Sequence, residues 1–353
     1  MNKIILSLAV VASASLFACG GDDSREIPEP DKPNPEQPTE PDKPETKATA
    51  YVTKVFDYRP AVGQFVNVMP TYEEGDNQQA MNNKALAAIG NNNKDGLISL
   101  GGYGGYVVVG FDHMIENKPH LRDFRVLGNS FYTDQAEKGE PDGGSCEPGI
   151  IMVSYDANQN GKPDDAWYEI AGSAHIDTTK EPWYKLAKEA GNKVETIFDY
   201  EITYHRPTKE PGSAAEMKEY IKWEDNQGDT GFKEKNKHHL QSYYPKWIKE
   251  DKLTFRGTRL PQNGIDKNGD GSFTVLYKFR YGYADNELNS KKESCIDIDW
   301  AVDSKGKKAN LPGVHFIKIY TGVNQQHNEI GESSTEIRGV EDLHILKEDV
   351  KSE

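Results

Sequence analysis

The sequence lacks the short motifs that mark common hydrolases and repeat folds. Its nine histidines form neither a His-x-His nor a His-Glu-x-x-His pattern, which argues against a zinc hydrolase. No Gly-x-Ser-x-Gly elbow is present, which argues against an α/β-hydrolase. No repeat period is visible either, so neither a propeller nor a solenoid is expected.

Positive charge is also in short supply. The 353-residue chain has 42 basic and 57 acidic residues, and its formal net charge is −15. Because no basic stripe is visible, nucleic acid and anionic membrane surfaces are not expected as direct partners. The acidic excess favours solubility and an affinity for divalent cations.

Long hydrophobic runs are missing except at the start of the chain. Lys3 precedes a short apolar run from Ile4 to Phe17, which is too short for a membrane-spanning helix and is typical of a secretory signal. The run ends in Leu16-Phe17-Ala18-Cys19, which looks like the lipobox of bacterial lipoproteins. This pattern predicts a signal peptide over residues 1–18 and acylation of Cys19. The alternative is an ordinary cleaved signal with an incidental cysteine.

The segment after Cys19 indicates where the protein is exported. Gly20-Gly21-Asp22-Asp23 resembles the acidic export signal of surface lipoproteins in Bacteroidota, which implies a lipid-anchored protein of the outer membrane facing the cell exterior. From Arg25 to Lys47 the chain has seven prolines and almost no apolar side chain, so it cannot build a core. We expect residues 19–49 to form an extended tether of ~3.1 Å per residue. A Pro-rich ligand for a partner domain is the alternative.

Residues 50–349 are expected to form an all-β domain. Short β-type runs are separated by Gly, Asn, Asp and Pro, which favours a jelly-roll-like β-sandwich with helical or irregular insertions, above all around residues 177–250. Helices are expected over 77–91, which Gly90 ends, and over 214–222; residues 225–239 are polar and are expected to form a loop. The expected strands lie within 50–58, 97–111, 123–128, 149–155, 166–172, 200–204, 253–260, 273–281, 294–302, 315–321 and 331–346.

Two acidic loops are candidate calcium sites. In the first, Asp156, Asn158 and Asn160 occupy positions one, three and five before a glycine, and Asp164 falls at position nine, as in the first half of an EF-hand loop. Position twelve is Trp167 and not the usual Glu, so a full EF-hand is excluded. Asp165 or Glu169 is the candidate substitute for that ligand. The second loop repeats the theme with Asp266, Asn268 and Asp270. Plain turns capped by their own side chains are the alternative for both loops.

Aromatic residues next to glycines or in weakly patterned segments are candidates for ligand contact, because exposed rings stack on sugar faces or on a flat macrocycle. These candidates are Tyr103, Tyr106, Trp183, Tyr184, Tyr243 and Trp247. Trp167 and Trp300 lie in apolar strand contexts and are expected in the core. Asp297 and Asp299 lie two apart on an expected strand, which is a weak signal for a glycosidase pair.

Beyond Cys19, the chain has only Cys146 and Cys295. Both would lie outside the cytoplasm, where a disulfide persists, so they either pair or remain two buried free thiols.

Several runs between residues 51 and 346 resemble uncharacterised cell-surface lipoproteins of Bacteroidota. They are Ser99-Leu100-Gly101-Gly102-Tyr103-Gly104-Gly105-Tyr106-Val107-Val108-Val109-Gly110-Phe111-Asp112-His113, Asp123-Phe124-Arg125-Val126-Leu127-Gly128-Asn129, Glu147-Pro148-Gly149-Ile150, Asp164-Asp165-Ala166-Trp167-Tyr168-Glu169-Ile170-Ala171-Gly172-Ser173, Asp297-Ile298-Asp299-Trp300-Ala301-Val302-Asp303 and Ser334-Thr335-Glu336-Ile337. Similar proteins are often encoded beside corrinoid (cobalamin) uptake genes or among other nutrient-capture systems. One departure is Cys146, where the resemblance implies a serine-like residue, and this favours its pairing with Cys295.

The resemblance implies capture of a nutrient at the cell surface. Our first hypothesis is a non-enzymatic lipoprotein that binds a corrinoid for an outer-membrane transporter, with a TonB-dependent transporter as the candidate partner. The second is a carbohydrate-binding sandwich of a glycan-uptake system. The third is an enzyme that acts on polysaccharide.

Overall fold

The computed structural model describes residues 47–92, 95–328 and 330–352. By its internal contacts the chain divides into two units, Met1–Thr46 and Lys47–Glu353, and the description below concerns the second. The expected signal peptide, Cys19 and nearly all of the expected tether therefore lie outside the described residues.

The described chain is predominantly β, with 33% of its residues in strands and 14% in helices. Its strands form six sheets, in which all pairs of neighbouring strands are antiparallel. The prediction of an all-β chain is thus confirmed at this coarser level. The small sheets are arranged like the four blades of a propeller, which the lack of a sequence repeat did not predict. The jelly-roll-like sandwich stays a prediction.

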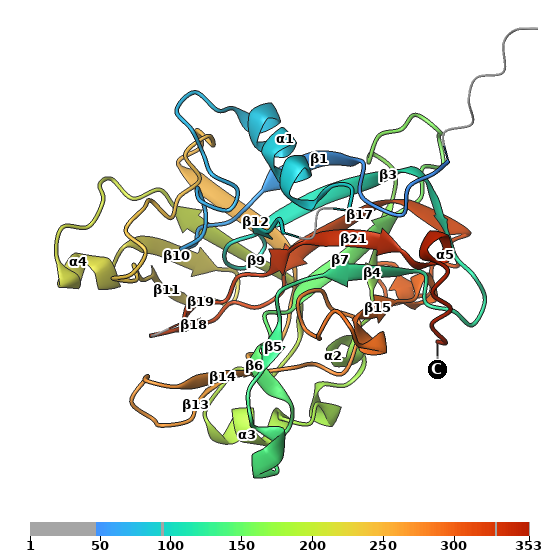
Figure 1. Ribbon diagram of the computed structural model, residues 1–353. Helices are drawn as coiled ribbons and strands as arrows, with labels where there is room; N and C mark the ends of the chain where they lie inside the picture. The colour runs from blue at the N-terminus through green and yellow to red at the C-terminus, as the bar shows by residue number, and fades with distance from the viewer. Residues whose placement is uncertain (1–46, 93–94, 329, 353) are drawn as a thin grey trace, which may run out of the picture. The chain divides into compact units, whose positions relative to one another are not determined.

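A six-stranded sheet lies at the centre of the fold (Figure 1). Its order is β1 (Lys54–Arg59), β3 (Tyr106–Glu116), β17 (Gly313–Thr321), β7 (Gly149–Ser154), β8 (Trp167–Ile170) and β16 (Ala301–Val302). A four-stranded sheet has the order β11 (Thr230–Lys233), β10 (Ile221–Asp225), β9 (Ile197–His205) and β12 (Lys252–Arg259).

Smaller sheets and short helices complete the fold. The sheets are β13 (Gly264–Asp266), β14 (Thr274–Tyr277), β6 (Gly143–Ser145) and β5 (Phe131–Tyr132); β15 (Cys295–Ile296), β4 (Phe124–Leu127) and β21 (Gly339–Asp342); β18 (Gln326–His327) and β19 (Gly331–Glu332); and β2 (Ile98–Ser99) and β20 (Glu336–Ile337). The α-helices are α1 (Gln78–Ile89), α2 (Ser173–Ile176), α3 (Tyr184–Glu189), α4 (Ala214–Lys218) and α5 (Leu343–Leu346). No helix among the described residues is long and apolar enough to cross a bilayer.

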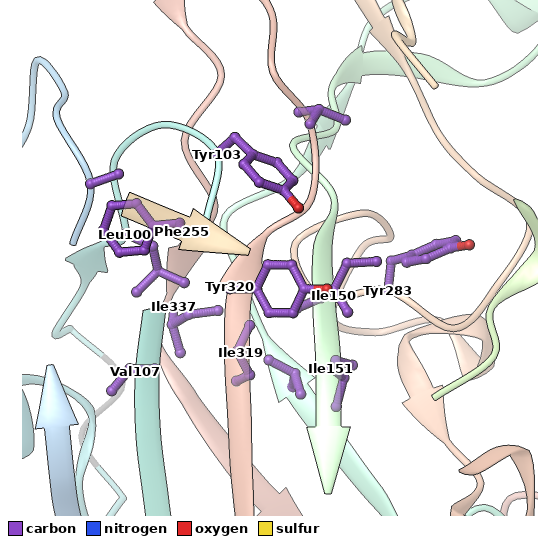
Figure 2. Close-up of a cluster of buried hydrophobic side chains, with 14 of the residues drawn as sticks. Leu100, Tyr103, Val107, Ile150, Ile151, Phe255, Tyr283, Ile319, Tyr320 and Ile337 are labelled. Atoms are coloured by element: carbon purple, nitrogen blue, oxygen red, sulfur yellow. The ribbon is translucent and has the colours of Figure 1, made fainter. Parts of the chain in front are cut away.

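Strict alternation gives the six-stranded sheet two different faces. One face carries apolar side chains that are fully buried, among them Val107, Ile151 and Ile319. Figure 2 shows these residues within a cluster that also contains Leu100 and Ile337. On the other face, Val108, Lys318, Met152 and Glu169 are register partners in a row across β3, β17, β7 and β8. This second face positions the cavities described below.

Helix α1 confirms the helix expected over residues 77–91. The Asn77 side chain caps its first turn by accepting a hydrogen bond from the Ala80 amide at 3.0 Å, and Gly90 follows its last residue. Asn82 fastens the helix to β1, because its amide oxygen accepts from the Tyr58 N–H at 2.9 Å and its amide nitrogen donates to the Phe56 carbonyl at 2.9 Å.

The segment over residues 177–250 is more regular than the sequence indicates. It contributes β9, β10 and β11, so the expected loop over 225–239 is wrong where β11 pairs with β10. The prediction failed because most residues of these two short strands are polar and show no apolar alternation, so that hydrogen bonds to neighbouring strands order them.

The glycine run after β2 is required by close packing of the backbone. Gly101 and Gly104 adopt positive φ angles of 67° and 85°, which favour glycine. Gly105 has ordinary φ, but a Cβ there would lie 1.9 Å from the Leu100 carbonyl oxygen and 2.1 Å from the Ala61 nitrogen. These contacts are with backbone atoms, which cannot rotate away.

We therefore expect Gly105→Ala to lower the free energy of unfolding by about 3 kcal/mol or more, because the backbone must move to admit the methyl group. Urea denaturation followed by tryptophan fluorescence measures the change. Gly212→Ala is the control, since a Cβ there meets only the Glu216 carboxylate at 3.5 Å. Equal stability of the two variants would contradict the packing argument.

Candidate functional site

A cavity of about 320 Å³ lies on the second face of the six-stranded sheet, between this sheet and β9 and β12. We call it the His175 cavity. Its lining comes from β7, β8, α2, β9, β12, β16 and the turn after β16, and comprises Met152, Trp167, Glu169, His175, Phe198, Asp199, Arg256, Gly257, Thr258, Val302, Asp303, Ser304 and Gly306. Distant parts of the chain thus meet at one place.

A chain of polar contacts forms the inner wall of this cavity. The Glu169 carboxylate contacts His175 Nε2, and His175 Nδ1 lies 3.0 Å from the Tyr283 hydroxyl. The other Glu169 oxygen accepts a hydrogen bond from the Tyr320 hydroxyl at 3.1 Å. The Tyr320 oxygen in turn accepts from the Thr258 N–H at 2.9 Å. The imidazole is therefore held in one orientation by groups from three elements.

Two glycines allow the tyrosines of this wall to come close. A Cβ at Gly257 would lie 2.6 Å from the Tyr320 hydroxyl oxygen, and a Cβ at Gly172 would lie 2.4 Å from the Tyr283 ring. Burial, with the nearby carboxylates, raises the pKa of both phenols well above the usual value of 10. Both tyrosines are therefore neutral hydrogen-bonding groups at physiological pH.

The outer part of the cavity combines an ion pair with aromatic rings. Arg256 Nη2 lies 3.5 Å from the Asp199 carboxylate, and both side chains are exposed. Phe198 is 59% exposed, and Trp167 is half-buried. Exposed rings beside carboxylate, imidazole and guanidinium groups suit a ligand with a flat apolar face and several hydroxyl groups.

A second cavity of about 370 Å³ adjoins the first, and Trp167 lines both. We call it the Lys318 cavity. Its lining is Phe56, Asp57, Tyr106, Val108, Lys162, Pro163, Trp167 and Lys318. Lys162 and Pro163 belong to the first acidic loop, so this loop forms one wall.

A third polar group is a buried cluster of three carboxylates. Oxygen atoms of Glu147, Asp285 and Glu336 all lie within 4.8 Å of one another, and the three side chains are buried. Asp285 accepts hydrogen bonds from the amides of Asn129, Ser130 and Glu336 at 2.8, 3.0 and 2.9 Å. Three buried carboxylates at this separation must be neutralised by protons or by a cation. Among the described residues, these three carboxylates are the acidic, His or Cys side chains that lie close enough together to hold a metal ion.

Burial, and then mutual repulsion, raises the pKa of the cluster. The pKa of Glu147 rises to about 8, mainly because of burial and then because of the Asp285 charge. The pKa of Glu336 is raised well above 4.5 for the same reasons, with Glu147 as its first charged neighbour. Burial also raises the pKa of Asp285, although backbone hydrogen bonds oppose the rise.

The structure brings together the side chains of the first acidic loop. Asp156 accepts from the amides of Asn160 and Gly161 at 3.1 and 2.8 Å, and Asp164 accepts from the side chains of Asn158 and Asn160. Asp165 is occupied separately, accepting from the Ala157 amide at 3.2 Å. The loop thus has the self-capped geometry of the turn alternative, and calcium binding stays a prediction.

The second acidic loop connects β13 and β14, which are paired with each other. Asp266 accepts from the amides of Asn268 and Gly271 at 3.1 and 2.7 Å, and Asp270 accepts from the Ser272 amide at 2.9 Å. These contacts describe a hairpin turn that its own side chains cap.

Most of the aromatic residues predicted to contact a ligand lie in the core instead. Tyr103, Trp183 and Tyr243 are 0% exposed and Trp247 is 7% exposed, so their expected exposure is wrong. Their rings pack against other aromatic rings, as Trp183 does against Phe279 at 4.9 Å between centroids. The prediction failed because short insertions with weak periodicity still fold over the sheets.

Other aromatic predictions fared differently. Tyr106 is half-buried and lines the Lys318 cavity, whereas the half-buried Tyr184 lines neither cavity. Trp167 is half-buried and does not pack against the core cluster, so its assignment to the core is wrong, whereas the half-buried Trp300 packs against the core. Asp297 and Asp299 line neither cavity, and Asp299 forms an ion pair with Lys308 at 3.1 Å.

Cys146 and Cys295 are both buried free thiols, so their pairing is wrong in this structure. Cys146 follows β6, and its carbonyl accepts from the Asn263 side chain at 2.8 Å. Cys295 lies in β15, in register with Arg125 of β4. The two cysteines are thus built into different sheets, which the sequence separation does not reveal.

Sequence reasoning identified Tyr106 of the Lys318 cavity but missed most of the other residues that form the two cavities and the cluster. Glu169, His175 and Lys318 come from separate elements, and no local spacing connects them. Glu147 and Glu336 each lie in a run of otherwise small or apolar residues. A single acidic residue in such a run was the one sequence signal that could have indicated a buried carboxylate.

The comparison with protein-family models finds no match to this chain, and no curated protein is similar to it in sequence. The likeness to cell-surface lipoproteins of Bacteroidota therefore stays a prediction.

The carboxylate cluster predicts a pH-dependent stability. A carboxyl group with a raised pKa keeps its proton in the folded state after the unfolded chain has lost it, so stability falls as the pH rises from the usual value of 4.5 towards about 8. In EDTA, we expect the melting temperature to fall by several degrees over this range, and to fall less in Glu147→Gln. Glu137→Gln, at an exposed position, should behave like the unmodified protein. An identical pH profile for all three proteins would contradict the assignment.

The possible cation sites can be distinguished by their response to calcium. If a loop or the cluster binds Ca²⁺, millimolar calcium should raise the melting temperature and EDTA should reverse the shift, because a ligand of the folded state stabilises it. Loss of the shift in Asp156→Asn would assign it to the first loop, in Asp266→Asn to the second, and in Glu336→Gln to the cluster. No shift in the unmodified protein would leave both loops as plain turns.

Proposed function

We propose that the protein is a non-enzymatic lipoprotein of the outer-membrane surface, anchored through Cys19, that captures a sugar-containing nutrient in the His175 cavity. The observation that carries this proposal is the composition of that cavity: the rings of Trp167 and Phe198 stand beside the hydrogen-bonding groups of Glu169 and His175. Sugars present apolar faces to aromatic rings and hydroxyl groups to such polar groups.

The size of the cavity favours a carbohydrate over a corrinoid. Ligand pockets span about 300–1,000 Å³, and the His175 cavity, at about 320 Å³, lies at the small end of this range. It can receive a ring the size of one sugar, whereas a corrinoid macrocycle is much larger. A corrinoid is therefore a less favoured ligand than a carbohydrate in this proposal.

The sandwich arrangement belongs to the proposal as well. It is supported by the close approach of β12 to β17, where Gly257 faces the Tyr320 hydroxyl. Two sheets that pack in this way leave their shared edge open for a ligand. A TonB-dependent outer-membrane transporter is the proposed recipient of that ligand.

An enzyme acting on polysaccharide is the second candidate, because a carboxylate held against an imidazole can act as a general base. The pair Glu169 and His175 favours this reading. Turnover of a bound glycan would support it over simple capture.

Binding is tested by calorimetric titration with gluco-, manno- and galacto-oligosaccharides, an oligogalacturonide and cyanocobalamin. We expect heat with at least one oligosaccharide, and a loss of affinity of roughly tenfold in Trp167→Ala, since one stacked ring contributes about 0.5–1.5 kcal/mol beyond its buried area. Phe232→Ala is the control, because Phe232 is an exposed ring on β11. Heat of binding with cyanocobalamin alone would make a corrinoid the preferred ligand again. No heat of binding with any compound would contradict the proposal.

A further inference from the structure

The Lys318 cavity contains an ammonium group with no carboxylate partner. Lys318 projects from β17 and is largely buried, and its Nζ lies over the Tyr106 ring, 4.2 Å from the centroid. Within residues 47–92, 95–328 and 330–352, the structure gives Lys318 no ion pair. A cation in such a place has lost much of its hydration, and in return it has one aromatic contact and the attraction of Asp57, which is too far away to form an ion pair.

The nearest acidic residue is already engaged. Asp57 also lines the cavity, but its carboxylate accepts a hydrogen bond from the Tyr106 hydroxyl at 2.6 Å. Lys162 adds a second ammonium group to the lining. The lining thus has two ammonium groups and one carboxylate, a local excess of positive charge in a chain whose formal net charge is −15. Outside the lining, the Lys54 ammonium group lies over the Phe56 ring, 4.2 Å from its centroid.

The position of Lys318 relative to the His175 cavity is fixed by the sheet. Lys318 is the register partner of Met152, and Met152 is the register partner of Glu169. Because neighbouring strands lie about 4.8 Å apart, the backbones at Lys318 and Glu169 are separated by about 10 Å on the same face. Trp167, two residues before Glu169 on β8, lines both cavities.

We propose that the two cavities are adjacent subsites for an acidic oligosaccharide, and that the Lys318 cavity receives a sugar unit bearing a carboxylate or sulfate group. The inference rests on the proposed function and names its ligand class. The anionic group pairs with the Lys318 ammonium group, Lys162 approaches it from the rim, and the neighbouring sugar ring occupies the His175 cavity. Trp167 stacks between them.

The test compares three galactose-based probes of equal length by calorimetry: an oligogalacturonide, a sulfated galacto-oligosaccharide and the neutral galacto-oligosaccharide. We expect at least one acidic probe to bind tenfold or more tightly than the neutral one, and this preference to shrink as ionic strength rises. The probe that binds identifies whether carboxylate or sulfate is the natural group.

Substitution locates the effect. Lys318→Met keeps the aliphatic stem and should abolish the preference for the acidic probe, so that acidic and neutral probes bind with equal affinity, whereas Lys318→Arg should retain the preference. Lys222→Met is the matched control, because Lys222 is an exposed residue of β10. If Lys318→Met fails to fold, the proposal is tested by Lys162→Gln and by high salt instead. Each of these changes should reduce the preference for the acidic probe.

The outcomes separate the inference from the proposed function. Equal affinity for neutral and acidic probes would overturn the anionic subsite and leave carbohydrate capture standing. A preference that survives in Lys318→Met at low salt would also overturn it. No binding of any probe, or of any compound in the wider titration, would overturn both.

Discussion

The register of the six-stranded sheet is the constraint on which the rest of the structure depends. Side chains alternate between the faces of a strand, so a slip of one residue would exchange the two faces completely. In the observed register, Ile319 and Ile151 enter the core while Lys318, Met152 and Glu169 form a row on the opposite face. The apolar face thus selects the register, and the register assembles the polar face. The candidate site is a consequence of core packing in distant strands.

The second sheet converts this polar face into cavities. Strand β12 crosses close to Tyr320, and this approach is possible because Gly257 has no side chain. The Thr258 amide then donates to the Tyr320 oxygen, and the Tyr320 hydroxyl donates to Glu169. Each buried polar group is satisfied by the next, which limits the cost of burying them. Phe198 and Arg256 remain outside this network and stay available to a ligand.

Local pattern was enough to predict the elements but not their meeting points. Short β-type apolar runs identified β3, β7 and β17, and Asn77 and Gly90 marked the ends of α1, because these signals depend on neighbours in sequence. The strands β10 and β11 escaped because hydrogen bonds to neighbouring strands, not apolar periodicity, order them. The aromatic predictions failed for a related reason. Whether a ring such as Trp183 or Trp167 is exposed depends on which segment covers it, and no local pattern records that.

The carboxylate cluster and the cavities have different roles, although both concentrate polar groups. Glu147, Asp285 and Glu336 are buried. Asp285 and Glu147 accept hydrogen bonds from backbone amides of separate segments, such as those at Asn129 and Ser334, and Glu336 accepts one from the Ser334 hydroxyl. These carboxylates therefore interact with other parts of the protein and not with solvent. A proton or a cation bound among them would stabilise the contact between those segments inside the protein. Lys318 and the Glu169–His175 pair face open volume instead. A ligand from solution can meet the second set alone, which is why the proposed capture site is placed at the cavities.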